Sequence, residues 1–442
     1  MNIILLSGGS GKRLWPLSND IRSKQFIKIF DNSFGVKESM LERVYRQIKS
    51  ADIDAIITIA TESRQVSAIR NQLSDAVSLS IEPTRRDTFP AIALAVAYLR
   101  YELAFANDDI VIVCPVDPYV DDGYFKSLKK LEDIISENNV NLALMGIEPT
   151  YPSQKYGYII PQTNERISKV RYFKEKPDEN AAKQYINMGA LWNAGIFAFR
   201  LSYILNKTRE IIDFKDYNDL RSKYSYLPKI SFDYSVVEKE ENIQVLRYKG
   251  DWKDVGTWNT ITETMTDNIN GKAIMSNTSR NTHIINELNI PILAIGCKDM
   301  VIAASTDGIL ISDKYESAFM KPYVDEIKGE VRYAEKSWGT YKVIDIQTNA
   351  MTISIDLKTD CMMSYHSHKN REEVLTVLSG VGSVIIDGVE TAVTSGVTIK
   401  IPKEAKHTLI AKSDIKAVEI QIGEELSRYD KTKYPLKLQS AY

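Results

Sequence analysis

The sequence has few cysteines and no long apolar run, and each shortage excludes a class of protein. Its three cysteines, Cys114, Cys297 and Cys361, are scattered, so they provide neither a disulfide framework nor a CxxC metal knuckle. The longest apolar stretches, such as residues 91–99, are too short for a membrane span, and no basic segment precedes a signal-peptide core. We therefore expect a cytoplasmic protein without membrane insertion.

An excess of positive charge is also missing. Lys and Arg total 56 against 58 for Asp and Glu, so no bulk positive field attracts nucleic acid or an acidic membrane. Any phosphate ligand must then be bound by a local cluster of side chains. The 442 residues and the 44% hydrophobic content are sufficient for two or three domains with packed cores.

The first part of the chain, residues 1–270, alternates short β-rich runs with helical patterns. The β-rich runs lie at residues 3–7, 56–60 and 110–114, and the helical patterns lie between them at residues 40–49 and 91–102. This rhythm predicts parallel βαβ units, and therefore an α/β, Rossmann-like domain with a mostly parallel sheet. Ligands of such sheets bind outside the carboxyl ends of the strands, so loops that follow strands are the expected functional positions.

The rest of the chain reads as β structure. Short strands at residues 293–296, 300–304 and 308–312 predict a β-rich connector over residues 271–328, which could form an oligomer contact. From Trp338 onward almost every segment reads as strand with tight turns. Residues 329–442 are therefore predicted to form a small all-β barrel.

A glycine-rich loop follows the first predicted strand. Its candidate nucleotide-binding residues are Leu6, Gly8, Gly9, Gly11, Lys12 and Arg13. Glycines let backbone N–H groups approach phosphate oxygens, and the cations add positive charge. A Walker A loop would need Gly at Leu6 and Ser or Thr at Arg13, and a Rossmann fingerprint would need Gly at Leu14, so both fail. The alternative from the glycines alone is a flexible turn.

The whole segment resembles the signature of sugar-nucleotide pyrophosphorylases, GG-x-G-x-R-L-x-P-L-[ST], which is followed shortly by a lysine, here Lys24. Trp15 and the Lys-Gln-Phe run at residues 24–26 resemble the mannose-1-phosphate guanylyltransferase branch. Lys12 stands where Thr is usual and Ser23 stands where Pro is usual. Neither exchange removes a charge that the chemistry needs.

Further segments resemble the same family in the same order. They are residues 82–91, 115–118, 156–159, 173–177, 192–195, 233–239 and 252–258. Two positions depart from the family pattern, because Asp87 replaces the common Asn and Pro118 replaces the usual His. The matching run of about 270 residues is too long for a chance loop match.

The resemblance implies that a sugar 1-phosphate attacks the α-phosphorus of a nucleoside triphosphate in line, with loss of pyrophosphate. Both reactants are anions, so catalysis requires cations, Mg²⁺ and alignment rather than a covalent nucleophile. The resemblance implies that Asp117 and Asp254 bind Mg²⁺ and that Arg13 and Lys24 neutralise the charge of the triphosphate and of the transition state. It implies that Glu82, Arg86 and Asp87 lie close to the base. It also implies that Lys176 binds the sugar phosphate and that the sugar is contacted by Gly157, Tyr158, Glu175, Asn193 and Glu238. Without the resemblance, the two aspartates would be turn or cap residues, and Tyr158 and Trp192 could equally be core aromatics.

Three of the four histidines lie in the predicted barrel. His366, His368, Glu373 and His407 have the spacing of the two cupin metal motifs, with Glu404 where Gly is usual. Strand periodicity places both histidines of an H-x-H pair on one face. Three imidazoles and a carboxylate suit Zn²⁺, Fe²⁺, Mn²⁺, Ni²⁺ or Co²⁺ rather than Ca²⁺. The alternative is surface histidines without a metal.

The barrel is similar to the domain fused behind guanylyltransferases in bifunctional enzymes that also isomerise mannose 6-phosphate. Residues 336–341 resemble the opening of that domain, and Arg371 falls on an arginine of its motif. His366 stands where that branch usually has Gln, and Lys336 and Ser337 replace Arg and Pro. A structural or dimerising barrel is the alternative to an isomerase.

The leading hypothesis is a GTP:mannose-1-phosphate guanylyltransferase that supplies an activated sugar for surface glycans and forms a homo-oligomer, such as a dimer through the connector or barrel. A second hypothesis keeps the chemistry with another sugar phosphate or another nucleotide such as CTP. A third treats the chain as a non-catalytic sugar-nucleotide sensor.

Overall fold

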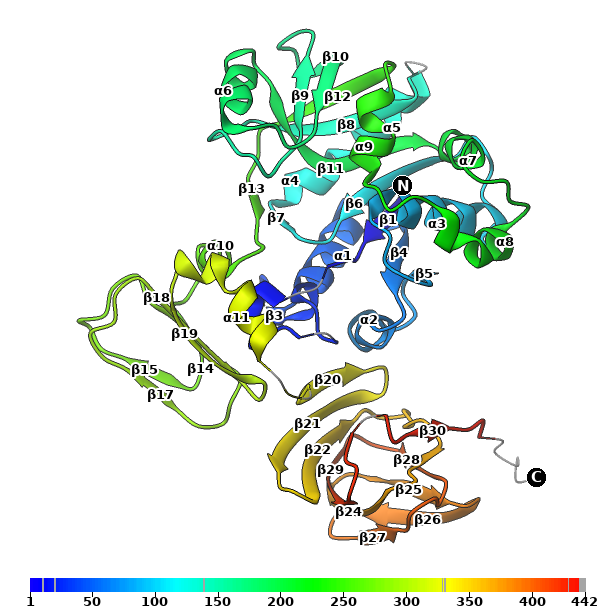
Figure 1. The fold of residues 1–442 in the computed structure, drawn as a ribbon, viewed down its shortest axis with the longest axis vertical. Coiled ribbons are helices and arrows are strands. Elements are labelled where there is room, and N and C mark those ends of the chain that lie inside the picture. Colours follow the sequence, from blue (N-terminus) through cyan, green and yellow to red (C-terminus); the bar gives the residue numbers. More distant parts are fainter. Residues whose placement is uncertain are drawn as a thin grey trace.

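The structure is a computed structural model that describes residues 1–9, 12–19, 21–137, 140–327, 329, 331–427 and 429–436. Figure 1 shows a large α/β unit that contains the N-terminus, a smaller β unit beside it, and a barrel at the other end of the long axis. Within the described residues, no helix is long and apolar enough to cross a membrane.

A nine-stranded sheet forms the centre of the α/β unit. Its order is β5 (Ser78–Glu82), β4 (Ile56–Glu62), β1 (Asn2–Leu6), β6 (Ile110–Pro115), β11 (Leu191–Arg200), β8 (Leu142–Ile147), β12 (Ile243–Tyr248), β10 (Ile167–Lys174) and β9 (Tyr158–Pro161). The strands from β5 to β6 are parallel, as the βαβ rhythm predicts. The sheet as a whole is mixed, because β11 is antiparallel to β6 and β8, and β10 is antiparallel to β12 and β9.

Helices cover both faces of this sheet. The alternating side chains of β1 show the division, since Ile3 and Leu5 belong to one buried core and Ile4 to the other. Helices α1 (Met40–Ala51), α2 (Val66–Leu73) and α5 (Leu128–Glu137) pack on the first face, and α3 (Thr88–Tyr101), α7 (Leu201–Arg209) and α8 (Tyr217–Ser222) pack on the second. The remaining helical segments are η1 (Lys12–Leu14), η2 (Lys24–Phe26), α4 (Asp122–Lys126), α6 (Glu179–Asn187), η3 (Tyr224–Tyr226), α9 (Phe232–Ser235), η4 (Val237–Lys239) and α10 (Trp258–Thr262).

The strand directions bring distant loops to one edge of the sheet. Strands β1, β4, β5, β6, β8 and β12 all point the same way, so their carboxyl ends meet there. The antiparallel strand β11 contributes its amino end to the same edge. Two small ribbons complete the unit, β2 (Phe30–Asp31) with β3 (Lys37–Glu38), and β7 (Pro118–Val120) with β13 (Trp252–Asp254). This edge is where a ligand of an open α/β sheet is expected.

The connector coils so that its strands pair with later turns of the same segment. Strands β14 (Ile269–Gly271), β16 (His283–Asn286) and β18 (Met300–Ser305) are parallel neighbours, and β19 (Gly308–Asp313) returns antiparallel to β18. Strands β15 (Ala273–Met275) and β17 (Ile292–Ala294) form a second parallel pair. The segment η5 (Glu316–Phe319) and helix α11 (Lys321–Glu326) lead toward the barrel.

Two antiparallel sheets form the barrel around one apolar core. The first contains β20 (Tyr333–Lys336), β21 (Gly339–Ile346), β22 (Ala350–Leu357), β29 (Ile415–Gly423), β24 (Arg371–Ser379) and β27 (Thr398–Ile401). The second contains β26 (Val389–Thr394), β25 (Val381–Ile386), β28 (His407–Ala411), β23 (His366–Ser367) and β30 (Thr432–Lys433). In Figure 1, β20 faces α2 of the α/β unit.

Candidate functional site

Two aspartates and two cations converge at the carboxyl edge of the sheet. Asp117 follows β6, and Asp254 ends β13, where it lies opposite Pro118 in the β7–β13 ribbon. The Lys24 ammonium donates to Asp117 Oδ2 at 2.9 Å. A Cβ placed on Gly256 would lie 3.2 Å from Asp254 Oδ1, 3.6 Å from Lys24 Nζ and 4.0 Å from Arg13 Nη1. The four predicted catalytic residues therefore surround one small space.

The charges of this group act on one another. Burial tends to raise the pKa of Asp117, but the adjacent Lys24 ammonium brings that pKa below its ordinary value. Burial raises the pKa of Asp254, and the charge of Asp117 acts in the same direction. Two carboxylates that share one lysine form a donor set of hard oxygens, which is what Mg²⁺ prefers.

The glycine-rich loop lies between β1 and η1. Gly8 and Gly9 are exposed, and Gly9 has a φ of 125°, which a residue with a side chain rarely adopts. The Leu6 carbonyl accepts from the N–H of Val116 at 3.4 Å, which joins this loop to the one after β6. Gly11 lies outside the described residues. Lys12 is bound by α11, because its ammonium donates to Asp325 Oδ1 at 2.6 Å.

The base-proximal segment begins where β5 ends. The Glu82 carboxylate accepts from the hydroxyl of Tyr224 at 2.5 Å, and burial raises the pKa of Glu82 to about 7. The guanidinium of Arg86 donates through Nε to the Leu227 carbonyl at 2.8 Å. Asp87 caps α3 by accepting from the N–H of Thr88 at 2.8 Å, with a positive φ of 72°.

Arg85 is a residue of this segment that sequence reasoning missed. Its guanidinium forms an ion pair with Glu62 and donates to the Gly9 carbonyl at 3.0 Å. It therefore joins the base-proximal segment to the glycine-rich loop. The only signal in the sequence was a second arginine beside Arg86.

The predicted sugar residues form a second cluster at the same edge. The Glu238 carboxylate accepts from the backbone N–H of Glu175 at 3.0 Å, and Glu175 forms an ion pair with Lys176 at 2.8 Å. The Asn193 N–H donates to the Gly157 carbonyl at 2.8 Å. A Cβ on Gly157 would lie 2.5 Å from Glu175 Oε2, so only glycine leaves room for that carboxylate.

The side chain of Tyr158 lies in the core beside this cluster, as the core-aromatic alternative predicts. It is 0% exposed, and its hydroxyl both donates to the Ser153 carbonyl and accepts from the Ser153 N–H, at 3.0 and 2.9 Å. Tyr158 is therefore a core aromatic with a satisfied hydroxyl. Trp192 is likewise buried, against Tyr151 and Tyr156.

Asp233 joins the sugar cluster although sequence reasoning assigned it no role. Its carboxylate accepts from the Asn193 amide at 2.7 Å, while the Asn193 side-chain oxygen accepts from the N–H of Gly195 at 3.1 Å. Burial, followed by the charge of Glu175, raises the pKa of Asp233 to about 7. The carboxylate therefore fixes the direction of the Asn193 amide.

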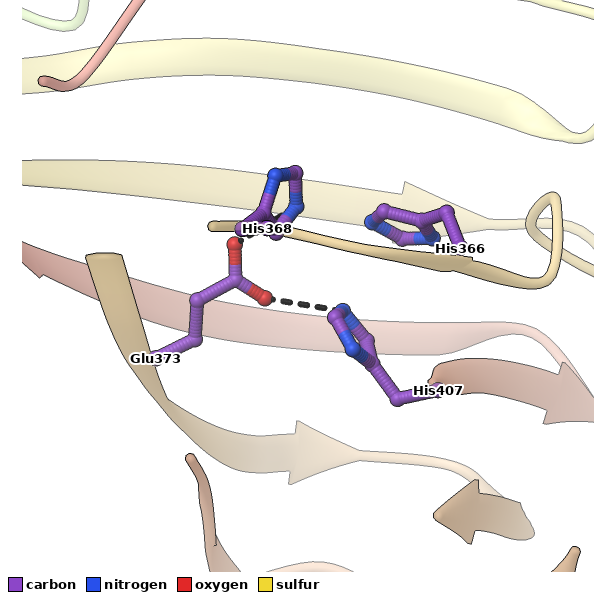
Figure 2. Close-up of side chains that lie close together, drawn as sticks. All are labelled: His366, His368, Glu373 and His407. Atoms are coloured by element: carbon purple, nitrogen blue, oxygen red, sulfur yellow. Dashed lines mark ion pairs between the residues drawn. The ribbon is translucent and has the colours of Figure 1, made fainter. Parts of the chain in front are cut away.

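The barrel brings the four predicted metal ligands together, as Figure 2 shows. His366 on β23 pairs with His407 on β28, and Glu373 comes from β24 in the other sheet. One ligand atom from each of these residues and from His368 lies within 4.8 Å of the others, and all four side chains are buried. Glu373 lies 3.1 Å from His368 Nε2 and 2.9 Å from His407 Nε2.

Hydrogen bonds orient the three imidazoles toward one point. Each Nδ1 faces a backbone carbonyl, that of Ser364 for His366, Asp430 for His368 and Ala405 for His407. With the proton on Nδ1, each Nε2 lone pair points into the cluster, as in metal sites. Among the described residues, His407 Nε2 and Glu373 Oε2 make no hydrogen bond, although they are buried and close. This donor set fits a divalent transition metal.

A cavity of about 730 Å³ opens beside the cluster. Its cationic lining residues are Arg332, Lys336, Arg371, Lys431 and Lys433, and Ile21 and Ser67 of the α/β unit also line it. Burial lowers the pKa of Lys431 to about 8. The Arg371 guanidinium lies 3.4 Å from Glu373 through Nε and donates to the Ser427 carbonyl at 2.8 Å. The cavity therefore suits an anionic ligand.

Two family models match the chain. The nucleotidyl transferase model matches residues 2–270, and the model of the mannose-6-phosphate isomerase C-terminal domain matches residues 325–434. The first match covers more than half of the chain. It includes both groups at the edge of the sheet, the one around Asp117, Asp254 and Lys24 and the one formed by the predicted sugar residues. The second includes the four-ligand cluster of the barrel.

Relatives match along almost the whole chain. The mannose-1-phosphate guanylyltransferase RfbM of Salmonella typhimurium is 28% identical, over 97% of this chain and 95% of its own length. A mannose-1-phosphate guanylyltransferase of Klebsiella pneumoniae is 27% identical, over 97% of each chain. A crystal structure described as a mannose-1-phosphate geranyltransferase, from Thermus thermophilus, is 26% identical with a TM-score of 0.59, over 73% of this chain and 98% of its own.

Proposed function

The chain belongs to the nucleotidyl transferase family, and we propose that it joins mannose 1-phosphate to the nucleoside monophosphate unit of GTP and releases pyrophosphate. The observation that carries this proposal is the convergence of Arg13, Lys24, Asp117 and Asp254 on one space at the edge of the sheet. The names of the relatives support the choice of sugar and base.

The proposed reaction needs charge neutralisation more than it needs a nucleophile. Asp117 and Asp254 would bind Mg²⁺, which would supply an electrophilic contact to phosphate oxygens. Arg13 binds the triphosphate, where a delocalised cation suits spread charge. Lys24 lies beside both carboxylates and neutralises the charge that develops on the α-phosphoryl group.

The sugar cluster aligns the attacking phosphate. Lys176 binds the phosphate of the sugar, while Glu175, Asn193 and Glu238 contact sugar hydroxyls. Burial opposes the charge of Lys176, but its hydrogen bond to Glu175 raises the pKa of the ammonium. The cation is therefore available to a phosphate at neutral pH.

The base-proximal residues would select the nucleotide. Guanine presents N–H donors on its Watson–Crick edge, and a carboxylate such as Glu82 accepts from adjacent donors. Arg86 and the Asp87 cap fix the chain around this position. We place the reaction in the cytoplasm, which supplies nucleoside triphosphates, and the three free cysteines support this placement.

A substrate panel tests the proposal. The protein is incubated with each of GTP, ATP, CTP and UTP against a set of sugar 1-phosphates, with Mg²⁺, and pyrophosphate release is measured. Mannose 1-phosphate with GTP should give the highest kcat/KM. A different best pair would replace the substrates, and binding without turnover on every pair would favour the sugar-nucleotide sensor.

The barrel has a second candidate function, favoured by its ligand cluster and the cations around its cavity. His366, His368, Glu373 and His407 would bind a divalent transition metal, which would supply an electrophile for neighbouring carbonyl and hydroxyl oxygens. Arg371 and Lys431 would neutralise the phosphate of a sugar 6-phosphate, whose isomerisation moves a proton between adjacent carbons. Fructose 6-phosphate formed from mannose 6-phosphate with added Zn²⁺, Mn²⁺ or Co²⁺, and lost in Arg371→Ala, would support an isomerase. No product with any of these metals would leave a structural barrel.

The three units would act as domains with boundaries near residues 270 and 328, and the connector offers a surface for a homo-oligomer. Strand β19 is the edge of its sheet, and Ile309 and Ile311 on it are exposed. A molar mass of twice that of the chain in light scattering, reduced by Ile311→Lys, would support a dimer through this edge.

A further inference from the structure

The turn that leads to Lys24 is bound by the connector and the barrel as well as by its own domain. Asn19 closes this turn, because its side-chain oxygen accepts from the N–H of Arg22 at 2.7 Å. The Asn19 amide nitrogen donates to Asp307 Oδ2 of the connector at 2.7 Å and to the carbonyl of Tyr333 in β20 at 3.3 Å. Both other units therefore fix the residue that shapes the turn.

Arg22 makes a second and stronger connection to the same two units. Its Nη1 donates to both carboxylate oxygens of Glu287 in the connector, each at 2.9 Å. Its Nε lies 3.5 Å from Glu335 in β20, and its guanidinium carbon lies 4.8 Å from the centre of the Tyr333 ring. The side chain is only 6% exposed, so this cation is poorly screened by solvent.

The side chains that follow Arg22 point into the candidate active site. The Ser23 hydroxyl donates to the Gly9 carbonyl of the glycine-rich loop at 3.3 Å. Lys24 then donates to Asp117 at 2.9 Å. Two residues of chain span at most about 7 Å, so a displacement of Arg22 is transmitted directly to the Lys24 backbone.

We propose that Arg22 is a positioning residue for nucleotidyl transfer, through which the connector and the barrel fix Lys24 without contacting either substrate. The inference rests on the proposed function, because it assigns Lys24 to transition-state charge. A misplacement of about 1 Å in a catalytic group can lower the rate about 100-fold. The contribution of Arg22 should therefore fall on kcat rather than on substrate binding.

Replacement of the cation tests this assignment. Arg22→Met keeps much of the side-chain volume and removes the contacts to Glu287 and Glu335. We expect kcat for pyrophosphate release to fall roughly 10- to 100-fold, with KM for either substrate changed less than about threefold. The matched control is Arg46→Met, which breaks a comparable pair with Glu38 inside the α/β unit, at 2.7 Å, and should leave kcat unchanged.

A double variant separates positioning from stability. Arg22→Met leaves the buried Glu335 without its cation, which destabilises the fold, and Arg22→Met/Glu335→Gln removes that charge. We expect the double variant to recover thermal stability but not kcat. Recovery of kcat together with stability would show a purely structural role and overturn the inference.

A milder variant covers the case in which Arg22→Met does not fold. The Glu287 side chain is 32% exposed, so Glu287→Gln weakens the contact without leaving a lone charge deep in the protein. It should lower kcat about 3- to 10-fold at unchanged KM. A wild-type kcat in Arg22→Met or in Glu287→Gln would overturn the role of Arg22 but would leave the proposed function intact. Absence of turnover in the wild-type protein would overturn the proposed function and this inference with it.

Discussion

Gly157→Ala tests whether the Glu175 carboxylate belongs to the sugar site. The added Cβ would lie 2.5 Å from Glu175 Oε2 and 2.5 Å from Phe173 Cζ, so both buried side chains must move. Overpacking of this kind costs about 1–3 kcal/mol of stability. A hydrogen bond from the sugar to a displaced carboxylate is worth about 1.5–3 kcal/mol, which corresponds to a roughly 10- to 150-fold loss of affinity.

The assay is calorimetric titration of the variant with mannose 1-phosphate and, separately, with GTP. We expect the loss of affinity for the sugar phosphate alone, together with a melting temperature lowered by a few degrees. Gly329→Ala is the matched control, because no described atom lies within 4 Å of a Cβ at that position. Unchanged affinity for the sugar phosphate, or equal weakening of both ligands, would refute the placement of Glu175.

Lys176→Ala should weaken sugar-phosphate binding far more than nucleotide binding, because its ammonium is paired with Glu175 beside the sugar residues; equal weakening in titrations with each ligand would place Lys176 elsewhere. Burial raises the pKa of Glu82 to about 7. The contribution of Glu82 to the stability of the fold is therefore fully present below its ordinary pKa of 4.5 and is lost as the pH rises through 7. Base binding needs the ionised form, so KM for GTP should fall between pH 6 and pH 8 in the wild type and stay level in Glu82→Gln; parallel profiles would remove Glu82 from the base site. His368→Ala should reduce the transition-metal content of the purified protein at least severalfold, because it removes one of four converging ligands, and equal metal content in both proteins would contradict the barrel metal site.

Local patterns were sufficient to predict the parts of the site that follow strands. The glycine-rich loop after β1 and Asp117 after β6 were expected at the carboxyl edge, because parallel βαβ units place such loops together. The period-two spacing of His366 and His368 predicts one shared face, and in the structure both lie close to Glu373 and His407. Helix α3 begins at Thr88, before the predicted start at residue 91, because Asp87 caps it.

Contacts between distant segments were not predictable in this way. Strand β11 shows the same apolar run whichever way it points, so its antiparallel insertion, and the mixed sheet that results, could not be read from periodicity. Asp233 and Arg85 look like ordinary surface charges until folding places them beside Asn193 and Gly9. The partners of Arg22 lie in two other units, so nothing near it in the sequence identifies them.

Asp117 and Asp254 would support nucleotidyl transfer as one metal-binding pair. This role can be measured as the rate of pyrophosphate release from GTP and mannose 1-phosphate across a Mg²⁺ titration, for wild type, Asp117→Ala and Asp254→Ala. We predict Mg²⁺-dependent turnover in the wild type and a loss of about 1000-fold or more in each variant, with circular dichroism unchanged. Turnover near the wild-type rate in either folded variant at saturating Mg²⁺ would contradict the account.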